Sequence, residues 1–519
     1  MAHTPTTDVL VTGAGPVGLS AAAELRRRGI RCRLIDRLPA RLPYAKAVGI
    51  QPRTMEVWDR MGLVTAALEA AVPLRGQLLY LNGREQARID LALPPEVPYG
   101  FCAIPQYETE RLLEDYLAGL GTHIERNTEL QSFTQDPDGV TAHLTTPGGG
   151  TEELRVRYLI GCDGAHSTVR KQLGLSFEGG AFPDEYMLAD VETDWDVPSG
   201  YTVRSSHRTE DGTTDDLLVC VPLPGRSRYR MSMLVPPELS APTDGAAVAH
   251  GLETTRRPDL HHIQAVVDRL APTPTTVSDL RWSSVFRISH RIVDRYADRR
   301  VFIAGDAAHI HPPTGGQGMN TGIQDACNLA WKLALVLRGD AGPALLAGYD
   351  TERRPVGEEV VGRTVRHAAH GIQADPDDPR TQLLREAQLL VTYRDSPLPG
   401  LRPGDRAPDC PGLTTPVAGY PLRLLDLLRP HPGHVLVRWT DTPADPPPAD
   451  GLPAVTVTPH PAAPGTYHDS TGAFARLYRP EGPTGFLVRP DTHLAARFPL
   501  PDTDAALTAY FTSLSAPAG

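Results

Sequence analysis

The residues with the clearest chemical meaning are the glycines of GAGPVG, Gly13 to Gly18, and the carboxylate of Asp36. The glycines follow an apolar strand and open a helix, so they permit a tight turn and a close approach of a pyrophosphate to the positive N-terminal end of the helix. Asp36 ends the next strand, where a carboxylate binds both hydroxyls of an adenosine ribose and repels a 2′-phosphate. The set predicts bound FAD or NAD rather than NADP; the alternative is a purely structural Gly-rich turn.

A second set of chemically capable residues follows a buried strand in VFIAGDAAHIHPPTGGQGMN, residues 301–320. Asp306, His309 and His311 have the composition of a two-His, one-carboxylate iron site. An H-x-H pair shares one face only where the backbone is regular, and Pro312 and Pro313 argue against that. The alternative is that Asp306 accepts hydrogen bonds from a polyol.

The loop PPTGGQG, from Pro312 through Gly316 to Gly318, would then bring bare backbone close to a flat ring. Gly318, Met319 and Asn320 would start a helix whose N-terminus faces partial negative charge on that ring. The apolar residues that follow recur at helical spacing and are expected to be core.

Two weaker patterns have ordinary structural explanations. In GCDGAHSTVRK, Asp163 and Gly164 directly follow a strand and are typical of a turn before a capped helix. Asp163, His166 and Ser167 are too close in sequence for triad geometry, and the chain lacks a nucleophile elbow, so hydrolysis is not favoured. Without further context QYETER, residues 106–111, is a helix start with solvated charges.

Length and charge limit the classes of protein to consider. At 519 residues the chain is long enough for two to four domains and for burial of a large cofactor. With 51 Lys and Arg against 62 Asp and Glu, its formal charge is −11, and no basic run is typical of a nucleic-acid site. We expect no nucleic-acid partner.

The sequence shows no secretion signal and no membrane span. Its six Cys are far apart without a CxxC, which argues for reduced thiols and against zinc. We expect a soluble, unsecreted protein without a membrane partner, located in the cytoplasm.

The expected elements place the polar residues at the ends of parallel strands. Residues 8–36 form one βαβ unit, and RVRYLIGCDG is a further strand, followed by a short helix that Ser167 caps and Gly174 ends. These elements and the strand at residue 301 predict a doubly wound sheet. Residues 176–285 alternate apolar and polar positions, which predicts inserted antiparallel strands.

Four segments are predicted from these patterns. Helices follow Gly339, a Pro- and Gly-rich boundary lies near 396–412, and the last unit contains a strand at GFLVRPD and a helix at DAALTAYFTSL. The predicted boundaries are 1–175 and 286–395 for the two parts of the cofactor domain, 176–285 for the substrate domain and 400–519 for the C-terminal domain.

Taken in order, GAGPVG with Asp36, GCDG and AGDAAHIHPPTGGQGMN resemble the FAD-dependent aromatic hydroxylases, single-component flavoprotein monooxygenases of the para-hydroxybenzoate hydroxylase type. The resemblance covers residues 5–395, and KAVGIQPRTMEVW and IPQYETERLL are similar to the branch that acts on polycyclic aromatic polyketides. It implies an α/β fold with a Rossmann-like FAD-binding domain, an inserted antiparallel substrate sheet and a C-terminal thioredoxin-like domain. LRPGDRAPD resembles the opening of that last domain, which here has only Cys410 and no CxxC, so a scaffold or homodimer role is expected rather than disulfide chemistry.

The resemblance also implies a role for each matched residue. The glycine turn would hold the pyrophosphate, Asp36 the adenosine ribose, and Asp306 the ribityl chain. The residues from Pro313 to Asn320 would line the flavin ring. The predicted FAD contacts are Gly13, Gly15, Pro16, Gly18, Asp36, Arg37, Lys46, Gln106, Arg111, Asp163, Gly164, Asp306, Pro313, Gly316, Gly318, Met319 and Asn320.

The implied reaction is aromatic hydroxylation. Bound FAD would take a hydride from NADPH or NADH, a transient co-substrate, react with O2 to give a C4a-hydroperoxyflavin and pass one oxygen to an electron-rich aromatic ring. Backbone N–H groups near Gly318 could stabilise negative charge on the flavin, and no catalytic acid or base is predicted. Baeyer-Villiger oxygenation and a non-catalytic flavin-binding protein remain alternatives, while the absence of W-x-W-x-I-P disfavours a halogenase.

Overall fold

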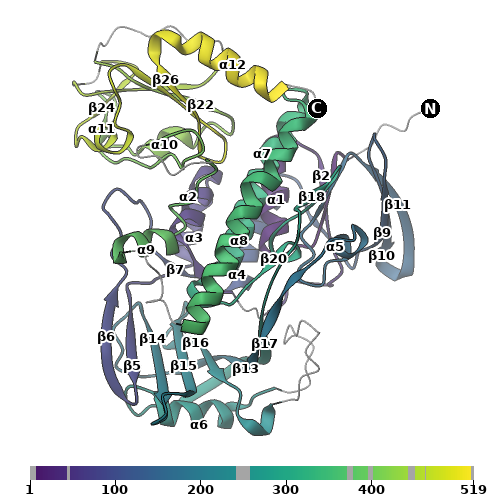
Figure 1. Ribbon diagram of the computed structural model, residues 1–519, viewed down its shortest axis with the longest axis vertical. Helices are drawn as coiled ribbons and strands as arrows, with labels where there is room; N and C mark the ends of the chain where they lie inside the picture. The colour runs from purple at the N-terminus through teal and green to yellow at the C-terminus, as the bar shows by residue number, and fades with distance from the viewer. Residues whose placement is uncertain are drawn as a thin grey trace.

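Residues 7–43, 47–240, 257–370, 378–394, 401–441, 451–461 and 463–515 are described by the computed structural model. The long helices α7 (Gly318–Arg338) and α8 (Ala347–His370) run through the middle of the molecule (Figure 1). The C-terminal unit lies at one end of the molecule, and a large β-sheet covered by α6 (Leu260–Leu270) lies at the other.

The first sheet has six strands in the order β18-β19-β12-β1-β2-β8, and all neighbours except β18 and β19 are parallel. Its central strands are short and fully buried, as expected of a sheet covered on both faces. The predicted βαβ unit and the predicted strands near residues 158 and 301 are confirmed. The strands are β1 (Val9–Thr12), β2 (Cys32–Asp36), β8 (Ile124–Arg126), β12 (Tyr158–Gly161), β18 (Ala297–Asp298) and β19 (Val301–Ile303).

Helices α1 (Pro16–Arg26) and α7 pack side by side in the same direction. Near their N-terminal ends, a Cβ on Gly322 would lie 2.6 Å from the Val17 side chain. Near their C-terminal ends, Arg338 donates a hydrogen bond to the carbonyl of Arg28. The two N-termini therefore lie at the same edge of the sheet.

The second sheet has eight strands in the order β20-β17-β13-β16-β15-β14-β5-β6, and all neighbours except β14 and β5 are antiparallel. The alternating pattern of residues 176–285 correctly predicts its central strands. Two further strands come from residues 76–90, because β5 pairs with the edge of β14 across more than a hundred residues. The strands are β5 (Gly76–Leu81), β6 (Arg84–Asp90), β13 (Glu178–Thr193), β14 (Tyr201–Arg208), β15 (Thr214–Pro222), β16 (Arg228–Leu234), β17 (Val277–Ile292) and β20 (His309–Ile310).

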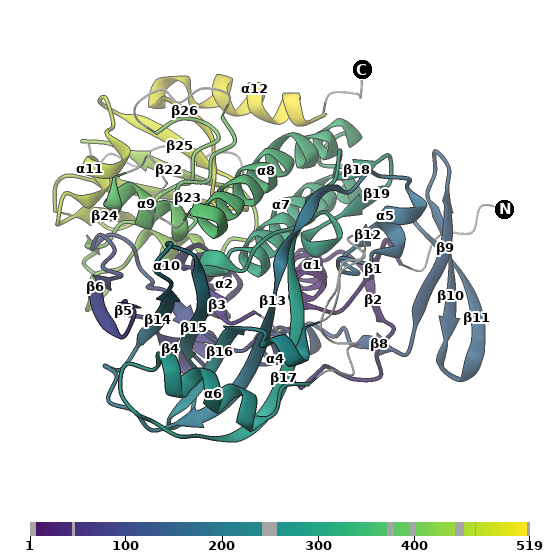
Figure 2. The same cartoon turned by 60° about the horizontal axis from the view of Figure 1, so that its bottom comes forward.

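The two faces of this sheet have different neighbours. Residues such as Met187 and Val285 pack on α6, which lies on the side facing away from α7 and α8 (Figure 2). On the opposite face Val221 packs with Val48 and Ala103 of the cofactor-side unit. Strand alternation thus gives one face to the core under α6 and the other to the cofactor side.

Shorter elements connect and cover these sheets. Ser167 accepts a hydrogen bond from the backbone of Arg170 and caps α5, while Gly174 follows with a φ of +64°, as the sequence predicts. The remaining elements of this region are α2 (Pro52–Met61), α3 (Val64–Glu69), α4 (Gln106–Gly119), α5 (Thr168–Gln172), α9 (Pro379–Glu386), β3 (Gly49–Ile50), β4 (Val72–Pro73), β7 (Cys102–Ala103), β9 (Glu129–Gln135), β10 (Val140–Thr146) and β11 (Gly150–Val156).

The C-terminal unit is a six-stranded mixed sheet in the order β21-β24-β23-β22-β25-β26 with its own apolar core. The predicted strand at GFLVRPD and the predicted last helix are confirmed as β25 and α12. Its elements are β21 (Leu413–Thr414), β22 (Val435–Trp439), β23 (Ala454–Thr458), β24 (Thr466–Asp469), β25 (Thr484–Val488), β26 (Leu494–Pro499), α10 (Leu424–Leu428), α11 (Ala473–Tyr478) and α12 (Thr503–Ser515).

A buried ion-pair cluster joins this unit to the central helices. Arg489 binds Glu352 of α8 at 2.8 Å and Asp491 at 2.6 Å. The indole N–H of Trp331, on α7, donates to Asp491 at 3.0 Å. Burial raises the pKa of Asp491, but the charge of Arg489 outweighs it and holds the pKa well below the usual range. The C-terminal unit is therefore fixed to α7 and α8 by charged groups that have little access to water.

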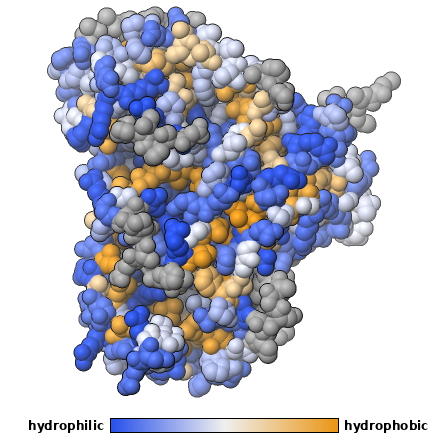
Figure 3. Space-filling model, viewed as in Figure 1, coloured by the Kyte–Doolittle hydropathy of each residue, from blue (hydrophilic) through white to orange (hydrophobic). Residues whose placement is uncertain are grey.

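The exposed surface is largely polar. Figure 3 shows hydrophilic residues over much of the face seen in Figure 1, with smaller apolar patches between them. Within the described ranges, no helix is both long enough and apolar enough to cross a membrane.

Replacing Asp491 should destabilise the protein. In Asp491→Ala, the buried positive charge of Arg489 keeps only the partly exposed Glu352 as a partner, so we expect a loss of about 3 kcal/mol in the free energy of unfolding. The urea midpoint, followed by circular dichroism, measures this loss. Asp502→Ala, at an exposed position before α12, is the control and should unfold like the wild type; equal midpoints for all three proteins would contradict a stabilising role for the cluster.

Candidate functional site

The polar residues singled out in the sequence meet at one edge of the first sheet. Gly13 follows β1, Asp36 ends β2, Asp163 follows β12, and Asp306 follows β19. These strands are neighbours and parallel, so their carboxyl ends lie together. In open α/β sheets this edge is where ligands bind.

The glycine turn is shaped for a phosphate ligand. Gly13 has a φ of +93°, and a Cβ on Gly18 would overlap the carbonyl oxygen of Gly13. A Cβ on Gly15 would meet nothing within 4 Å, so this glycine borders open space. Helix α1 begins at Pro16 without a side-chain cap, which leaves its first backbone N–H groups to an external anion.

Asp36 is held in place by the turn that it faces. Its carboxylate accepts hydrogen bonds from the backbone N–H of Ala14 at 2.6 Å and of Leu38 at 2.8 Å. The neighbouring Arg37 is exposed. A carboxylate with two of its lone pairs fixed in this way can still accept hydrogen bonds from a ribose.

Helix α4 begins at Gln106 near the same sheet edge, whereas the side chain of Arg111, on the same helix, points toward solvent. The backbone N–H of Gln106 donates to the carbonyl of Ala47 at 3.0 Å, and its side chain donates to Glu110 at 2.8 Å. Arg111 is 42% exposed and forms ion pairs with Glu108 and Asp115 on its own helix. Lys46 lies outside the described residues.

Asp163 forms the local turn that its sequence predicts. Its carboxylate accepts hydrogen bonds from the Ser167 hydroxyl at 2.5 Å and the Thr168 N–H at 2.7 Å, while Gly164 adopts a φ of +76°. Burial raises the pKa of Asp163, against the lowering effect of the Ser167 hydrogen bond. Because the Ser167 hydroxyl is used in this cap, the geometry does not support a nucleophilic triad.

Asp306 is exposed on η3 (Gly305–Ala307), beside the first turn of α1. A Cβ on Gly305 would lie 2.8 Å from Val17, which shows how closely η3 and α1 approach. Asp306 therefore lies on a segment that packs directly against the helix that follows the glycine turn.

The loop before α7 exposes backbone rather than side chains. Gly315 and Gly316, in η4 (Thr314–Gly316), have φ values of +73° and +64°, which favour glycine. Pro313 precedes them and is exposed. Helix α7 begins at Gly318 without a side-chain cap, so a second uncapped helix N-terminus faces the same edge.

Asn320 fastens this loop instead of presenting its amide to a ligand. Its amide nitrogen donates to the carbonyls of Gly49 at 2.8 Å and Gly316 at 2.7 Å, and its oxygen accepts from the Gln51 N–H at 2.9 Å. The side chain is fully buried. Its neighbour Met319 packs partly against the core.

A group of buried amides lies behind the loop and is not evident from the sequence. The Gln317 side chain donates to the Gly315 carbonyl at 3.0 Å and to Glu386 at 2.9 Å. Gln388 donates to the side chain of Gln317 at 2.8 Å and accepts from Gln324. Gln388 follows α9, so residues more than sixty positions apart fix the loop, and no local motif could have revealed them.

The H-x-H pair is not a metal site. His309 is buried and binds Asp325 at 2.8 Å, and the other oxygen of Asp325 accepts from Arg353 at 2.7 Å. Asp325 also accepts from the N–H of Gly305 at 3.2 Å. Burial lowers the pKa of His311 to about 4. His309 and Asp325 therefore anchor the backbone next to Asp306.

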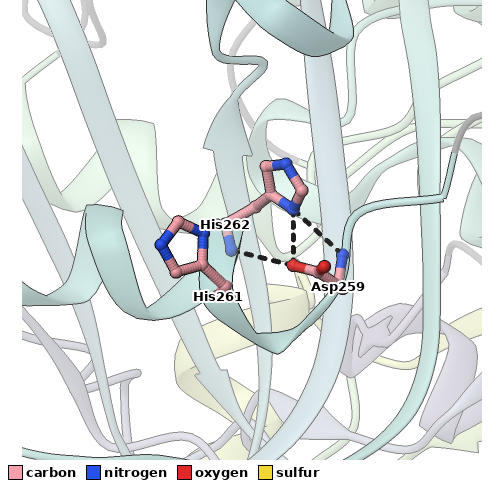
Figure 4. Close-up of side chains that lie close together, drawn as sticks. All are labelled: Asp259, His261 and His262. Atoms are coloured by element: carbon pink, nitrogen blue, oxygen red, sulfur yellow. Dashed lines mark hydrogen bonds and ion pairs between the residues drawn. The ribbon is translucent and has the colours of Figure 1, made fainter.

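One carboxylate and imidazole group in the described residues has spacing suited to a metal ion, at Asp259, His261 and His262 (Figure 4). Asp259 caps α6, where its carboxylate lies 2.5 Å from the His262 ring and accepts from the His262 N–H. This group lies at the start of α6, away from the cofactor edge, and the side chains of Asp259 and His262 already form the cap of that helix.

An apolar and aromatic surface covers the cofactor-facing side of the second sheet. Leu188, Phe286 and Ile288 form a cluster there, with Tyr186 and Trp282 against it. The rings of Tyr186 and Phe286 lie 5.9 Å apart. A flat apolar molecule would find contact on this face of the sheet.

Comparisons with known proteins bear on the same residues. The family model described as FAD binding domain matches residues 6–364. A flavin-dependent monooxygenase from Mycobacteroides abscessus is 36% identical over 440 residues, which cover 81% of this chain and 86% of that protein. A 6-methylpretetramide 4-monooxygenase from Streptomyces rimosus is 39% identical over 359 residues, which cover 69% of this chain and 60% of that protein.

A solved structure extends the likeness to the whole chain. Aklavinone-11 hydroxylase, in a ternary complex with FAD and aklavinone, matches with a TM-score of 0.78 and 26% identity. The match covers 99% of both chains, so it includes the C-terminal unit.

Glu110, behind Gln106, should make stability depend on pH. Burial raises the pKa of Glu110 to about 7, from 4.5 for an unperturbed carboxyl. The folded protein holds this proton more tightly than the unfolded chain, so its stabilising effect is complete below pH 4.5 and is lost as the pH rises to 7. The loss is on the order of 3 kcal/mol.

Glu110→Gln cannot ionise, so this decline should disappear, and urea midpoints at pH 5 and pH 7.5 measure the difference. Glu69→Gln, at an exposed position in α3, should keep the pH dependence of the wild type. If Glu110→Gln also kept it, another group would be responsible.

Proposed function

This chain belongs to the FAD binding domain family, and from that premise we propose that it hydroxylates an aromatic polyketide or a related phenolic compound. It is an FAD-dependent monooxygenase, like the relatives it resembles over most of its length. Use of NAD(P)H and O2 is typical of these enzymes.

The observation that carries the proposal is the convergence of two uncapped helix N-termini on one sheet edge. Helix α1 presents N–H groups behind Gly15, and α7 presents N–H groups at Gly318. The first suits the pyrophosphate of FAD and the second suits the electron-rich part of the flavin ring. When bound, FAD supplies the redox and oxygen chemistry, and the protein binds, orients and excludes water.

We propose one role for each part of this edge. Asp36 binds the adenosine ribose and Asp306 the ribityl chain. The loop from Pro313 to Gly318 lies along the flavin ring, and Asn320 holds the loop in shape. Gln106 supports the cofactor from α4, whereas the exposed, ion-paired Arg111 gives only long-range attraction to phosphate.

The substrate would bind between the flavin loop and the aromatic face of the second sheet. Arg204, on β14, belongs to that face by strand register, and its side chain is partly enclosed by neighbouring groups while part of it stays open to solvent. Burial lowers the pKa of Arg204, and the nearby Tyr186 opposes this shift, so the two side chains interact. We propose that they orient the phenolic oxygen, while the apolar cluster contacts the rings.

Names of the relatives support this substrate class. One relative is a 6-methylpretetramide 4-monooxygenase, and the solved hydroxylase is in a ternary complex with FAD and aklavinone. Both support a large fused-ring substrate for this chain.

The C-terminal unit is proposed to be a thioredoxin-like scaffold without redox activity. Its one cysteine, Cys410, is buried, and burial raises the pKa of its thiol well above the usual value. A thiol in that state is a poor nucleophile. The ion pairs to α7 and α8 support a role in holding those helices.

Phenolic fused-ring compounds should accelerate NAD(P)H oxidation by the purified yellow protein. The expected stimulation is at least tenfold, with one oxygen atom added per NAD(P)H consumed. Oxygen uptake, NAD(P)H absorbance and product NMR measure it, and NMR shows whether the oxygen sits on a ring carbon. A panel of such compounds that binds without stimulation would argue against hydroxylation.

Asp306→Ala should weaken FAD binding by about 10- to 100-fold, because hydrogen bonds to a charged group contribute about 1.5–3 kcal/mol. The purified variant should be colourless or pale yellow, and flavin fluorescence titration measures its Kd. Asp340→Ala, at an exposed position after α7, is the control. Unchanged FAD affinity in Asp306→Ala would remove the ribityl role.

A further inference from the structure

A cleft lined by three arginines and one aspartate lies beside the proposed cofactor edge, outside the residues assigned to FAD. Its volume is about 410 Å³. Arg41 comes from the loop after β2, Tyr107 from the first turn of α4, Arg228 from β16, and Arg281 and Trp282 from β17. The cleft thus lies between the cofactor-side unit and the second sheet.

Most of the charged side chains in this cleft already have a partner of opposite charge. Asp190, which also lines it, is buried and bound by Arg230 at 2.8 Å, so its charge is already compensated. Arg41 pairs with Glu114 at 2.9 Å, and Arg281 pairs with Asp279 at 2.8 Å.

Arg228 differs from these arginines. Among the residues that the structure describes, Arg228 has no ion-pair partner, although it is only partly exposed. Its guanidinium therefore has unused donors that point to an external anion.

A second cleft of about 430 Å³ continues from the first and shares Arg228 and Arg281. Arg226 lines it, together with Glu192 and Asp194. The chain as a whole carries a formal charge of −11, so a group of arginines in one place contrasts with its overall charge. Arginines gathered in this way attract and orient an anionic ligand.

We infer that the phosphate groups of the nicotinamide dinucleotide dock in this cleft, with Arg228 as a principal contact. The inference rests on the proposed function, which requires NAD(P)H to reach the flavin from outside. Phosphate oxygens match the guanidinium donors, and the exposed parts of the Tyr107 and Trp282 rings suit the adenine or nicotinamide ring. The fused-ring substrate is instead assigned to the apolar face beyond Trp282.

The position of the cleft fits this assignment. Tyr107 directly follows Gln106, and Arg41 lies five residues after Asp36, so one wall borders the proposed FAD contacts. The opposite wall contains Asp190 and Trp282, which share a sheet face with Tyr186 by strand register. A dinucleotide anchored here has the cofactor on one side and the substrate face on the other.

The test uses the FAD-loaded protein and its basal NAD(P)H oxidation without any aromatic compound. Arg228→Gln should raise the KM for NADPH or NADH about 10- to 100-fold, the loss expected for hydrogen bonds from a charged group. Its kcat, FAD content and affinity for the aromatic compound should stay near those of the wild type. Arg228→Lys should have an intermediate KM.

Arg84→Gln is the matched control, because Arg84 is exposed on β6, at the far edge of the same sheet. Inorganic pyrophosphate should inhibit the wild type and Arg84→Gln competitively against the dinucleotide, and should inhibit Arg228→Gln much less. The wild-type inhibition does not depend on the folding of any variant.

An unchanged KM in Arg228→Gln, or a loss of affinity confined to the aromatic compound, would overturn the docking site alone. A lack of competition by pyrophosphate in the wild type would do the same. A wild type that binds FAD but oxidises neither dinucleotide would overturn the proposed function itself.

Discussion

Close backbone contact among α1, η3 and α7 is the constraint on which the cofactor edge depends. Gly18 packs on Gly13, and Gly305 and Gly322 pack around Val17, at separations that leave no room for a Cβ. Only this spacing lets the two parallel helices begin at the same edge of the sheet. Their positive ends then face the same sheet edge, so a single ligand can contact both.

Behind that edge, buried polar side chains hold backbone in place and leave the chemistry to the cofactor. Asn320 and Gln317 fix the glycine loop, and Asp325 fixes the chain beside Asp306 through Gly305 and His309. Each of these groups is buried and hydrogen-bonded, which makes its position well defined. Such an arrangement orients dipoles before the reaction begins, and it explains why no acid or base stands out.

Much of the cofactor edge could be predicted because its signals are local. The turn Gly13 to Gly18, the carboxylate of Asp36 and the Ser167 cap all act within a few residues of strands and helices with clear periodicity. The supports could not be predicted, since Asp325 and Gln388 resemble ordinary helix or loop residues until distant partners meet them. The pairing of β5 with β14 depends on contacts far along the chain. The same is true of the burial of His309, a residue whose type alone would also suit a metal site.

The alternation of β13, β16 and β17 has a consequence for how such enzymes diversify. Residues facing α6, such as Met187 and Val285, belong to the folding core, whereas their neighbours Tyr186 and Phe286 face the ligand side. Substitutions at every second position can therefore change which ring systems the enzyme accepts, while the stability of the sheet is largely preserved. Related enzymes can therefore differ in the residues on the ligand side of a strand while they retain the residues on its core side.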